Sequence, residues 1–158
     1  MKSQGLDHVA IMVKDMDRAV ETLSNLFQMN FKEIVEAGER LGVRLCVSVP
    51  DLQIELISVV DPVKAKSSEH GREFVEFAER VGEGLYRILL RVDDAEGVAA
   101  DAERIGLRVG LKMEEKQLGG VLPHFKEVIF SRKEGLSSYG IGVIEWIGGK
   151  SNGNSEGV

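Results

Sequence analysis

The chain has 158 residues and a net charge of −6, from 20 Lys and Arg against 26 Asp and Glu. This length fits one domain, or two very small ones, with enough chain to bury a core. An acidic balance with interspersed signs argues against a nucleic-acid binder. The single Cys excludes an internally disulfide-bonded scaffold, and no apolar run approaches the ~20 residues that span a bilayer. We therefore expect a cytoplasmic protein that binds neither membrane nor nucleic acid.

The first third of the chain predicts a strand, a helix and three further strands. Residues 6–13 form an apolar, β-rich run, and Asp15 or Asp17 can cap the helix that follows. The apolar face of that helix is indicated by Ala19, Val20, Leu23, Leu26 and Phe27. The later strands are predicted over residues 31–37, 43–49 and 52–59. Residues 67–80 then carry apolar side chains at helical spacing, which predicts a linker helix.

The same pattern returns later in the chain, at an offset of 79 (85 − 6). Residues 85–92 repeat the strand, Asp94 repeats the cap of Asp15, and an apolar helix face follows. Three more strands are predicted near 108–111, 126–130 and 140–147. In the closing strands, Glu55 aligns with Glu145 at an offset of 90 (145 − 55). Because this offset exceeds the first one by 11 residues (90 − 79), the second copy is expected to contain a net insertion. The stretch from 112 to 124, where glycines and a proline break the periodicity, is the expected place for it.

These repeats predict an α+β fold made of two tandem βαβββ modules, which form a curved mixed sheet around an open cleft. We expect a single domain over residues 1–147. Within it, module one covers 5–60, a linker helix lies in 61–82 and module two covers 83–147. Residues 148–158 are rich in Gly and polar side chains and are expected to form a flexible tail.

Three short motifs resemble those of a known superfamily. They are Leu6-Asp7-His8, Ile54-Glu55-Leu56, and the segment Gly82-Glu83-Gly84-Leu85-Tyr86-Arg87-Ile88. With the duplication, they resemble the vicinal oxygen chelate superfamily, over about residues 5–147. The branch they resemble most contains the methylmalonyl-CoA epimerases and glyoxalase-like proteins. The resemblance implies two modules whose metal ligands line the inner face of one sheet.

The resemblance implies four metal-ligand positions, which fall on His8, Glu55, Arg87 and Glu145. Imidazole and carboxylate groups suit a divalent ion such as Zn, Co, Ni, Mn or Fe. The guanidinium of Arg87 cannot be a ligand, because it stays protonated and has no free lone pair. Two alternatives therefore stay open. Either His8, Glu55 and Glu145 hold a metal in an atypical shell, or Arg87 replaces the metal and pairs with the carboxylates.

Further residues are candidates for catalysis. Catalytic roles are predicted for Glu145, for Arg87 as a cation that stabilises an oxyanion, and for His124 as an acid–base group on a loop. The epimerases carry a catalytic Glu where this chain has Arg40, which is a departure from their pattern. His70 is expected at the surface, and Cys46 is expected to be a small buried apolar residue.

Two functions follow. The first is a glyoxalase- or epimerase-like enzyme, an isomerase or lyase that abstracts a proton next to a carbonyl, with a CoA thioester as one candidate substrate. The alternative is a metal-free protein that binds or sequesters a small molecule, as bleomycin-resistance proteins do. In both cases the resemblance implies a small-molecule ligand and a homodimer.

Overall fold

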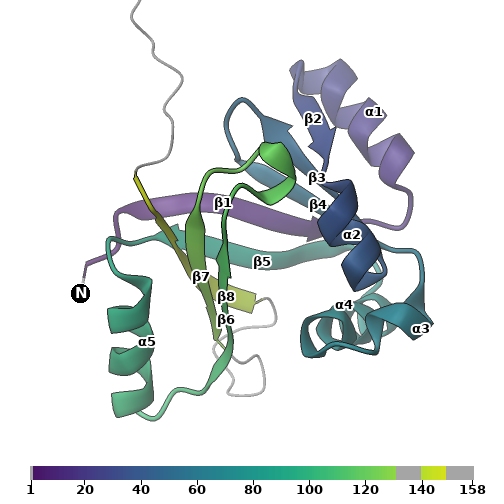
Figure 1. The fold of residues 1–158 in the computed structure, drawn as a ribbon. Helices are drawn as coiled ribbons and strands as arrows, with labels where there is room; N and C mark the ends of the chain where they lie inside the picture. The colour runs from purple at the N-terminus through teal and green to yellow at the C-terminus, as the bar shows by residue number, and fades with distance from the viewer. Residues whose placement is uncertain (1, 131–139, 149–158) are drawn as a thin grey trace, which may run out of the picture.

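The computed structural model describes residues 2–130 and 140–148 and shows one curved sheet with helices on both faces (Figure 1). The strands are β1 (Gly5–Met12), β2 (Asn30–Glu33), β3 (Val43–Val49), β4 (Ile54–Val59), β5 (Gly84–Arg91), β6 (Val109–Glu115), β7 (Phe125–Phe130) and β8 (Gly140–Trp146). The helices are α1 (Met16–Phe27), α2 (Val35–Leu41), α3 (Pro62–Ala65), α4 (Glu69–Arg80), α5 (Ala95–Arg104) and the short 3₁₀ turn η1 (Leu118–Gly120).

The eight strands lie in the order β2-β3-β4-β1-β5-β8-β7-β6. Each half of the sheet contains one parallel pair, β1 with β4 and β5 with β8, while β1 and β5 run antiparallel where the halves meet. The mixed α+β architecture predicted from the repeat is confirmed. Each half supplies four strands to a half-barrel whose inner face is available for a site.

The register between β1 and β5 shows the internal symmetry directly. Val9 lies opposite Ile88, and their positions differ by 79 (88 − 9), the offset of the sequence repeat. The two neighbouring pairs are Ala10–Arg87 and His8–Leu89. Leu89 is 79 residues after Ala10 and Arg87 is 79 residues after His8, so the offset converts one pair into the other. A pseudo-twofold axis therefore passes between the two central strands, and it relates His8 to Arg87.

The register of the closing strands corrects the alignment made from the sequence. Ala10 pairs with Glu55, and its symmetry mate Leu89 pairs with Gly142. The true offset is 87 (142 − 55), so the position that matches Glu55 is Gly142 and not Glu145.

The strand predicted over residues 31–37 is also corrected. The strand β2 ends at Glu33, and Val35–Leu41 form helix α2. Ala37 and Gly38 are buried on its inner side, and Gly42 ends the helix in a left-handed conformation (φ 67°). A side chain at Gly38 would lie 2.7 Å from the carbonyl oxygen of Val43, so only glycine lets this helix approach β3 so closely.

The remaining elements follow the predicted order with shifted ends. The linker helix is α4, preceded by the short α3, and Ser68 caps α4 by accepting from the Gly71 N–H. The expected insertion contains the last part of β6, followed by η1. Residues 149–158, in the predicted tail, lie outside the described residues. No helix among residues 2–130 and 140–148 is long and apolar enough to cross a membrane.

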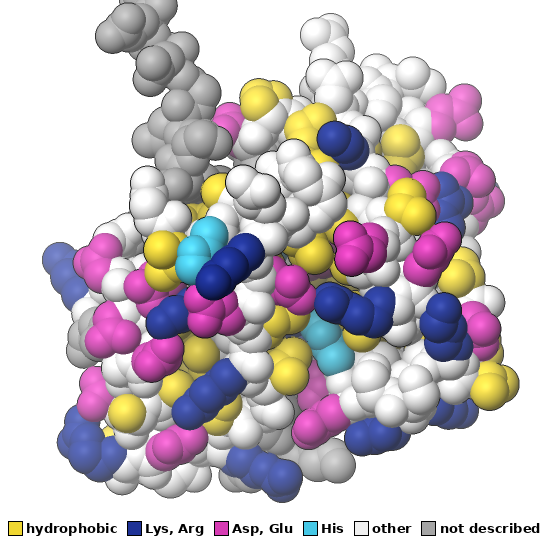
Figure 2. Space-filling model, viewed as in Figure 1, with side chains coloured by type: hydrophobic (Ala, Val, Ile, Leu, Met, Phe, Trp, Pro, Cys, Tyr) yellow, Lys and Arg dark blue, Asp and Glu magenta, His cyan; other side chains and the backbone are white. Residues whose placement is uncertain are grey.

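The helices divide between the two faces of the sheet. On one face, α1 packs on Cys46 and Leu56, and α5 packs on Val128 and Val143. On the other, the larger core is closed by α2, α4 and the η1 segment. Acidic and basic side chains are interspersed over the face shown in Figure 2. The prediction that Cys46 is buried is confirmed, and burial raises the pKa of its thiol.

Candidate functional site

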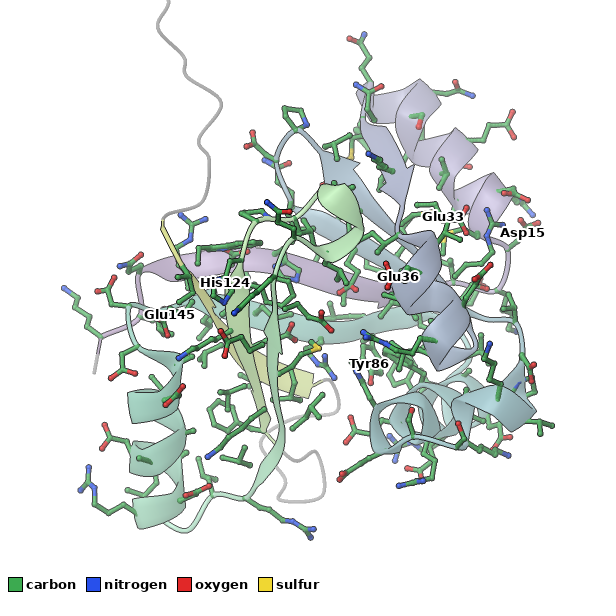
Figure 3. All side chains as sticks on the ribbon, viewed as in Figure 1. Asp15, Glu33, Glu36, Tyr86, His124 and Glu145 are labelled. Carbon is green, nitrogen blue, oxygen red and sulfur yellow. The ribbon has the colours of Figure 1, made fainter. Side chains whose placement is uncertain are left out.

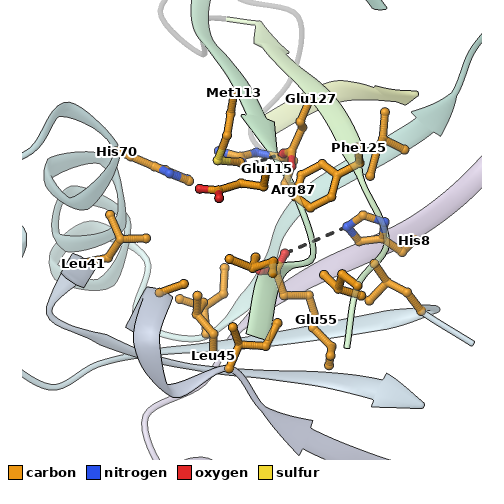
Figure 4. Close-up of a pocket in the computed structure, with 18 of the residues that line it drawn as sticks. His8, Leu41, Leu45, Glu55, His70, Arg87, Met113, Glu115, Phe125 and Glu127 are labelled. Atoms are coloured by element: carbon orange, nitrogen blue, oxygen red, sulfur yellow. Dashed lines mark hydrogen bonds and ion pairs between the residues drawn. The ribbon is translucent and has the colours of Figure 1, made fainter. Parts of the chain in front are cut away.

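The inner face of the sheet carries a pocket of about 660 Å³, counting the part that opens to solvent (Figure 4). Strands from both halves form its floor, while α2, α4 and η1 close it. Its polar wall consists of His8, Arg40, Glu55, His70, Arg87, Glu115 and Glu127. The apolar wall is built from Ile34, Ala37, Leu41, Leu45, Val47, Leu52, Ile57, Phe74, Met113, Leu118, Leu122, Phe125 and Ile144. A mostly apolar pocket with a few convergent polar groups is the usual form of a small-molecule site.

His8 is held in one orientation by its neighbour Asp7. The Nδ1 atom of His8 lies 2.8 Å from Oδ1 of Asp7, whose side chain is fully buried. A carboxylate can only accept, so Nδ1 of His8 donates to Asp7 and Nε2 is the ring nitrogen left to face the pocket. That Nε2 atom is 4.0 Å from Oε2 of Glu55, beyond hydrogen-bond range. A base of fixed orientation therefore faces the pocket.

An irregularity in β1 makes this pair possible. Neighbours along a regular strand point to opposite faces. The pairing of β1 with β5 shifts register between Leu6 and His8, and Asp7 sits in the shift. Asp7 also accepts hydrogen bonds from Arg91 Nε and Trp146 Nε1, both at 2.9 Å through Oδ2. Its carboxylate is therefore anchored independently of His8.

Arg87 lies on the pocket floor and is 3% exposed. Its Nη1 donates to Oε1 of Glu127 at 3.4 Å, and its Nη2 lies 3.7 Å from Oε2 of Glu73. The Nη2 group also donates to the hydroxyl of Tyr86 at 3.3 Å. The Nε atom is buried and has no hydrogen-bond partner among the described residues. The predicted pairing of Arg87 with carboxylates is found, but its partners are Glu127 and Glu73.

Glu127 was not identified from the sequence. It lies on β7, 8% exposed, opposite Ile144 of β8 and Met113 of β6. Burial raises the pKa of its carboxyl above the ordinary value, although Arg87 acts in the opposite direction. A carboxyl group of raised pKa beside a guanidinium is suited to donate a proton or a hydrogen bond. Its signal in the sequence was a single acidic residue inside the apolar run Phe125–Phe130.

Arg40 and Glu115 form an ion pair beside the pocket. Arg40 Nη2, on α2, lies 2.8 Å from Oε1 of Glu115, at the end of β6. The pair joins the two halves of the chain. Arg40, which replaces the expected catalytic Glu, is thus engaged with Glu115, and Glu39 lines a different surface hollow.

His70 differs from the surface residue expected. It lies on α4, its ring packs against Phe74 with centroids 4.4 Å apart, and it lines the pocket. Its Nε2 atom is buried without a hydrogen-bond partner among the described residues. Burial, reinforced by Arg87 and Arg40, lowers the pKa of His70 to about 3. The ring is therefore neutral at physiological pH.

Two of the residues predicted for catalysis do not line this pocket. Glu145 accepts a hydrogen bond at Oε2 from the Ala95 N–H, 3.0 Å away, at the start of α5. His124 lies 2.6 Å from Oε1 of Glu114. In the view of Figure 3 both lie toward the α5 end of the sheet. The structure therefore brings together His8, Glu55 and Arg87, but not Glu145 or His124.

The donor set does not fit the metal that the resemblance implies. Of the four positions related by the pseudo-twofold axis, His8 and Glu55 can bind a metal. The other two are a buried guanidinium, Arg87, and Gly142, which has no side chain. In the described part of the chain, no three His, Cys, Asp or Glu side chains are grouped as metal ligands would be.

Comparison with known proteins agrees with this fold. A family model described as a glyoxalase-like domain matches residues 6–146. No curated protein matches the chain.

Solved structures of similar fold include methylmalonyl-CoA epimerases. One from Mycobacterium tuberculosis is 22% identical, with a TM-score of 0.69 over 92% of this chain and 89% of that one. A variant from Streptomyces coelicolor, in complex with 2-nitronate-propionyl-CoA, is 17% identical, with a TM-score of 0.70 over 96% of this chain and 100% of that one. A hypothetical protein from Bacillus halodurans C-125 is 15% identical, with a TM-score of 0.66 over 92% and 96% of the two chains.

Proposed function

Because this chain belongs to the glyoxalase-like domain family, as its motifs indicated, we propose that its inner pocket catalyses proton transfer at a carbon next to a carbonyl. One observation carries the proposal. His8, oriented by Asp7, presents a free Nε2 to the same pocket that holds Arg87 and Glu127. A base, a cation and a carboxyl of raised pKa are what enolisation requires.

In the proposed reaction, Nε2 of His8 takes the proton from the carbon. The electron pair of the C–H bond moves toward the carbonyl, and the oxygen becomes an enolate. Arg87 stabilises that oxygen by its charge, while the Glu127 carboxyl keeps its proton for the carbon. Return of a proton from His8 restores the starting isomer, whereas delivery to the other face gives the epimer. The second acid is Glu127, which lies on the other half of the sheet.

This chemistry is assigned to side chains alone. A divalent metal would act as a Lewis acid at the carbonyl oxygen. Here the buried guanidinium of Arg87 stands at a position that the resemblance gives to a metal ligand, so no step is assigned to a metal. We expect a chelator to leave the reaction unchanged.

The substrate class follows from the wall of the pocket. With the Glu127 carboxyl protonated, Glu55 and Glu115 balance Arg40 and Arg87 there, so the wall carries no excess charge and accepts a carbonyl compound with or without a charged group. A CoA thioester fits if only its acyl end enters. Related folds have been solved with methylmalonyl-CoA and with 2-nitronate-propionyl-CoA, and these supply the first probes.

The test is deuterium incorporation from D₂O at the carbon next to the carbonyl, followed by mass spectrometry with methylmalonyl-CoA and propionyl-CoA. We expect exchange with the wild-type protein, and a loss of about 10²- to 10⁴-fold in His8→Gln. Asp51→Asn, an exposed change outside the pocket, is the matched control and should exchange normally. Equal rates in wild type and His8→Gln would reject His8 as the base.

A second candidate is a metal-free binding protein. It is favoured by the partners of Arg87, whose charge is already shared among Glu127, Glu73 and the Tyr86 ring (4.9 Å from the guanidinium carbon). Tight ligand binding without any deuterium exchange would support it. The homodimer also stays a prediction, which light scattering after size exclusion tests.

A further inference from the structure

Two buried side-chain nitrogen atoms lack a hydrogen-bond partner in the described part of the chain, and both belong to residues that line the pocket. They are Nε2 of His70 and Nε of Arg87. Buried polar atoms are almost always paired, since an unpaired one has lost its hydrogen bond to water without gaining another. Two such atoms at one pocket indicate that a bound molecule supplies the missing partners.

The chemistry of the missing partner is set by Arg87. Guanidinium N–H groups can only donate, so the ligand must offer an acceptor to Arg87. A neutral imidazole can donate or accept at Nε2, and it adapts to the same kind of acceptor by carrying its proton there. The Glu73 carboxylate lies 3.7 Å from Nη2 of Arg87 and already balances its charge, which favours an uncharged acceptor, such as a carbonyl oxygen, over a carboxylate.

The position of His70 indicates that the ligand has two polar ends. His70 comes from α4 and His8 from β1, and Figure 4 shows them on opposite sides of the pocket, with Arg87 and Glu127 between. The apolar side chain of Leu41 lies on the His70 side of the pocket, and that of Leu45 lies along its lower edge (Figure 4). A ligand that reaches both histidines has two polar ends and a short apolar body.

We propose that His70 is a specificity-determining residue, whose neutral Nε2–H donates to a second, uncharged carbonyl oxygen of the substrate. The substrate class is therefore a compound with two separate carbonyl groups. One is enolised beside His8, and the other is bound by His70. This inference deepens the proposed function and rests on it for the role of the first carbonyl.

The experiment compares two uncharged probes of equal chain length. Methyl 4-oxopentanoate carries a ketone and an ester carbonyl, whereas 2-heptanone carries the ketone alone. Calorimetry on the wild-type protein should show tighter binding of the keto ester, by about 3- to 10-fold for one added neutral hydrogen bond. His70→Phe keeps the ring contact with Phe74 but removes the donor, so it should bind both probes equally. His70→Gln retains a donor and should keep part of the preference.

The matched control is Glu76→Gln, on the exposed side of the same helix, which should bind as the wild type does. A preference for the keto ester that persists in His70→Phe would overturn the proposal. Equal affinity of the wild-type protein for the two probes, or no binding of either, would overturn it as well. Thermal unfolding of each variant establishes that it is folded.

Deuterium exchange on the same samples separates this inference from the proposed function. If the preference for the keto ester depends on His70 but no carbonyl compound exchanges deuterium, the binding role of His70 is supported and the proposed enzymatic function is rejected. Exchange that depends on His8, with no effect of His70 on binding, rejects only the specificity role of His70.

Discussion

Asp7 accepts a hydrogen bond from Nε1 of Trp146 at 2.9 Å, although 139 residues separate them in the chain. The contact joins β1, in the first half of the chain, to β8, in the second. The same carboxylate orients His8 and pairs with Arg91. A single buried side chain therefore holds the candidate base and ties the two halves together.

The substitution Asp7→Asn should therefore lower both the stability of the fold and the rate of deuterium exchange. An amide can still accept from Trp146, but it removes the buried negative charge from the pairs with Arg91 and His8. We expect the free energy of unfolding in urea to fall by about 2–4 kcal/mol. The exposed change Asp51→Asn should alter it by less than about 0.5 kcal/mol. A similar small change in Asp7→Asn would contradict the anchoring role.

The raised pKa of Glu127 predicts a pH-dependent stability. A carboxyl whose folded-state pKa is raised contributes stability below its unfolded value of 4.5, and that contribution is lost as pH rises through the higher folded-state pKa. Glu127→Gln cannot ionise. The unfolding free energy of the wild type minus that of the variant should therefore decrease as pH rises above 4.5. Urea unfolding between pH 4 and pH 8 measures it, and a difference that grows with pH would contradict the raised pKa.

The lowered pKa of His70 predicts a pH dependence of stability opposite to that of Glu127. A base buried in its neutral form contributes stability above its unfolded pKa of 6.5, and this is lost as pH falls toward the folded-state value of about 3. Since Phe cannot take up a proton, His70→Phe should lose less stability than the wild type between these limits. Parallel stability curves for the two proteins over this range would show that His70 is not buried as described.

The symmetry of the sheet predicts how a metal site could be built. Under the pseudo-twofold axis, Arg87→His and Gly142→Glu repeat His8 and Glu55 in the second half. We expect the double variant to bind one divalent ion per chain, measured by elemental analysis after dialysis against zinc, while Arg87→His alone binds more weakly. A side chain at 142 would begin 2.8 Å from Ile129 Cδ1 and 3.0 Å from the Val128 carbonyl oxygen. The variant should therefore lose about 1–3 kcal/mol of stability before metal is added. Zinc uptake no greater than that of the wild type would contradict the inferred equivalence.

The sequence predicted the fold better than the site. The offset of 79 (88 − 9) is visible in both strand and cap, and the β1–β5 register shows the same offset. The helix α2 was missed because Val35–Leu41 is too short to show a clear helical period and carries Gly38, a poor helix former, in its middle. Tertiary contacts hold it, namely the burial of Ala37, the close approach of Gly38 to Val43 and the Arg40–Glu115 ion pair.

The site was predicted in part, for reasons that particular residues show. His8, Glu55 and Arg87 were found because they follow from the motifs. Glu145 was aligned with Glu55 by residue type, whereas the hydrogen-bond register assigns that place to Gly142. The role of Asp7 depends on the register shift between Leu6 and His8, which cannot be predicted from the residue types.

The pseudo-twofold axis between Val9 and Ile88 has a consequence for how such a protein changes its chemistry. A duplicated module starts with two identical sets of side chains, and identical ligands around an ion are tolerated. Proton transfer between two faces of a carbon needs unlike groups, a base on one side and an acid with a cation on the other. Arg87 stands at the position related to His8, and β7 contributes the Glu127 carboxyl, so the two halves of the sheet present unlike groups to one pocket.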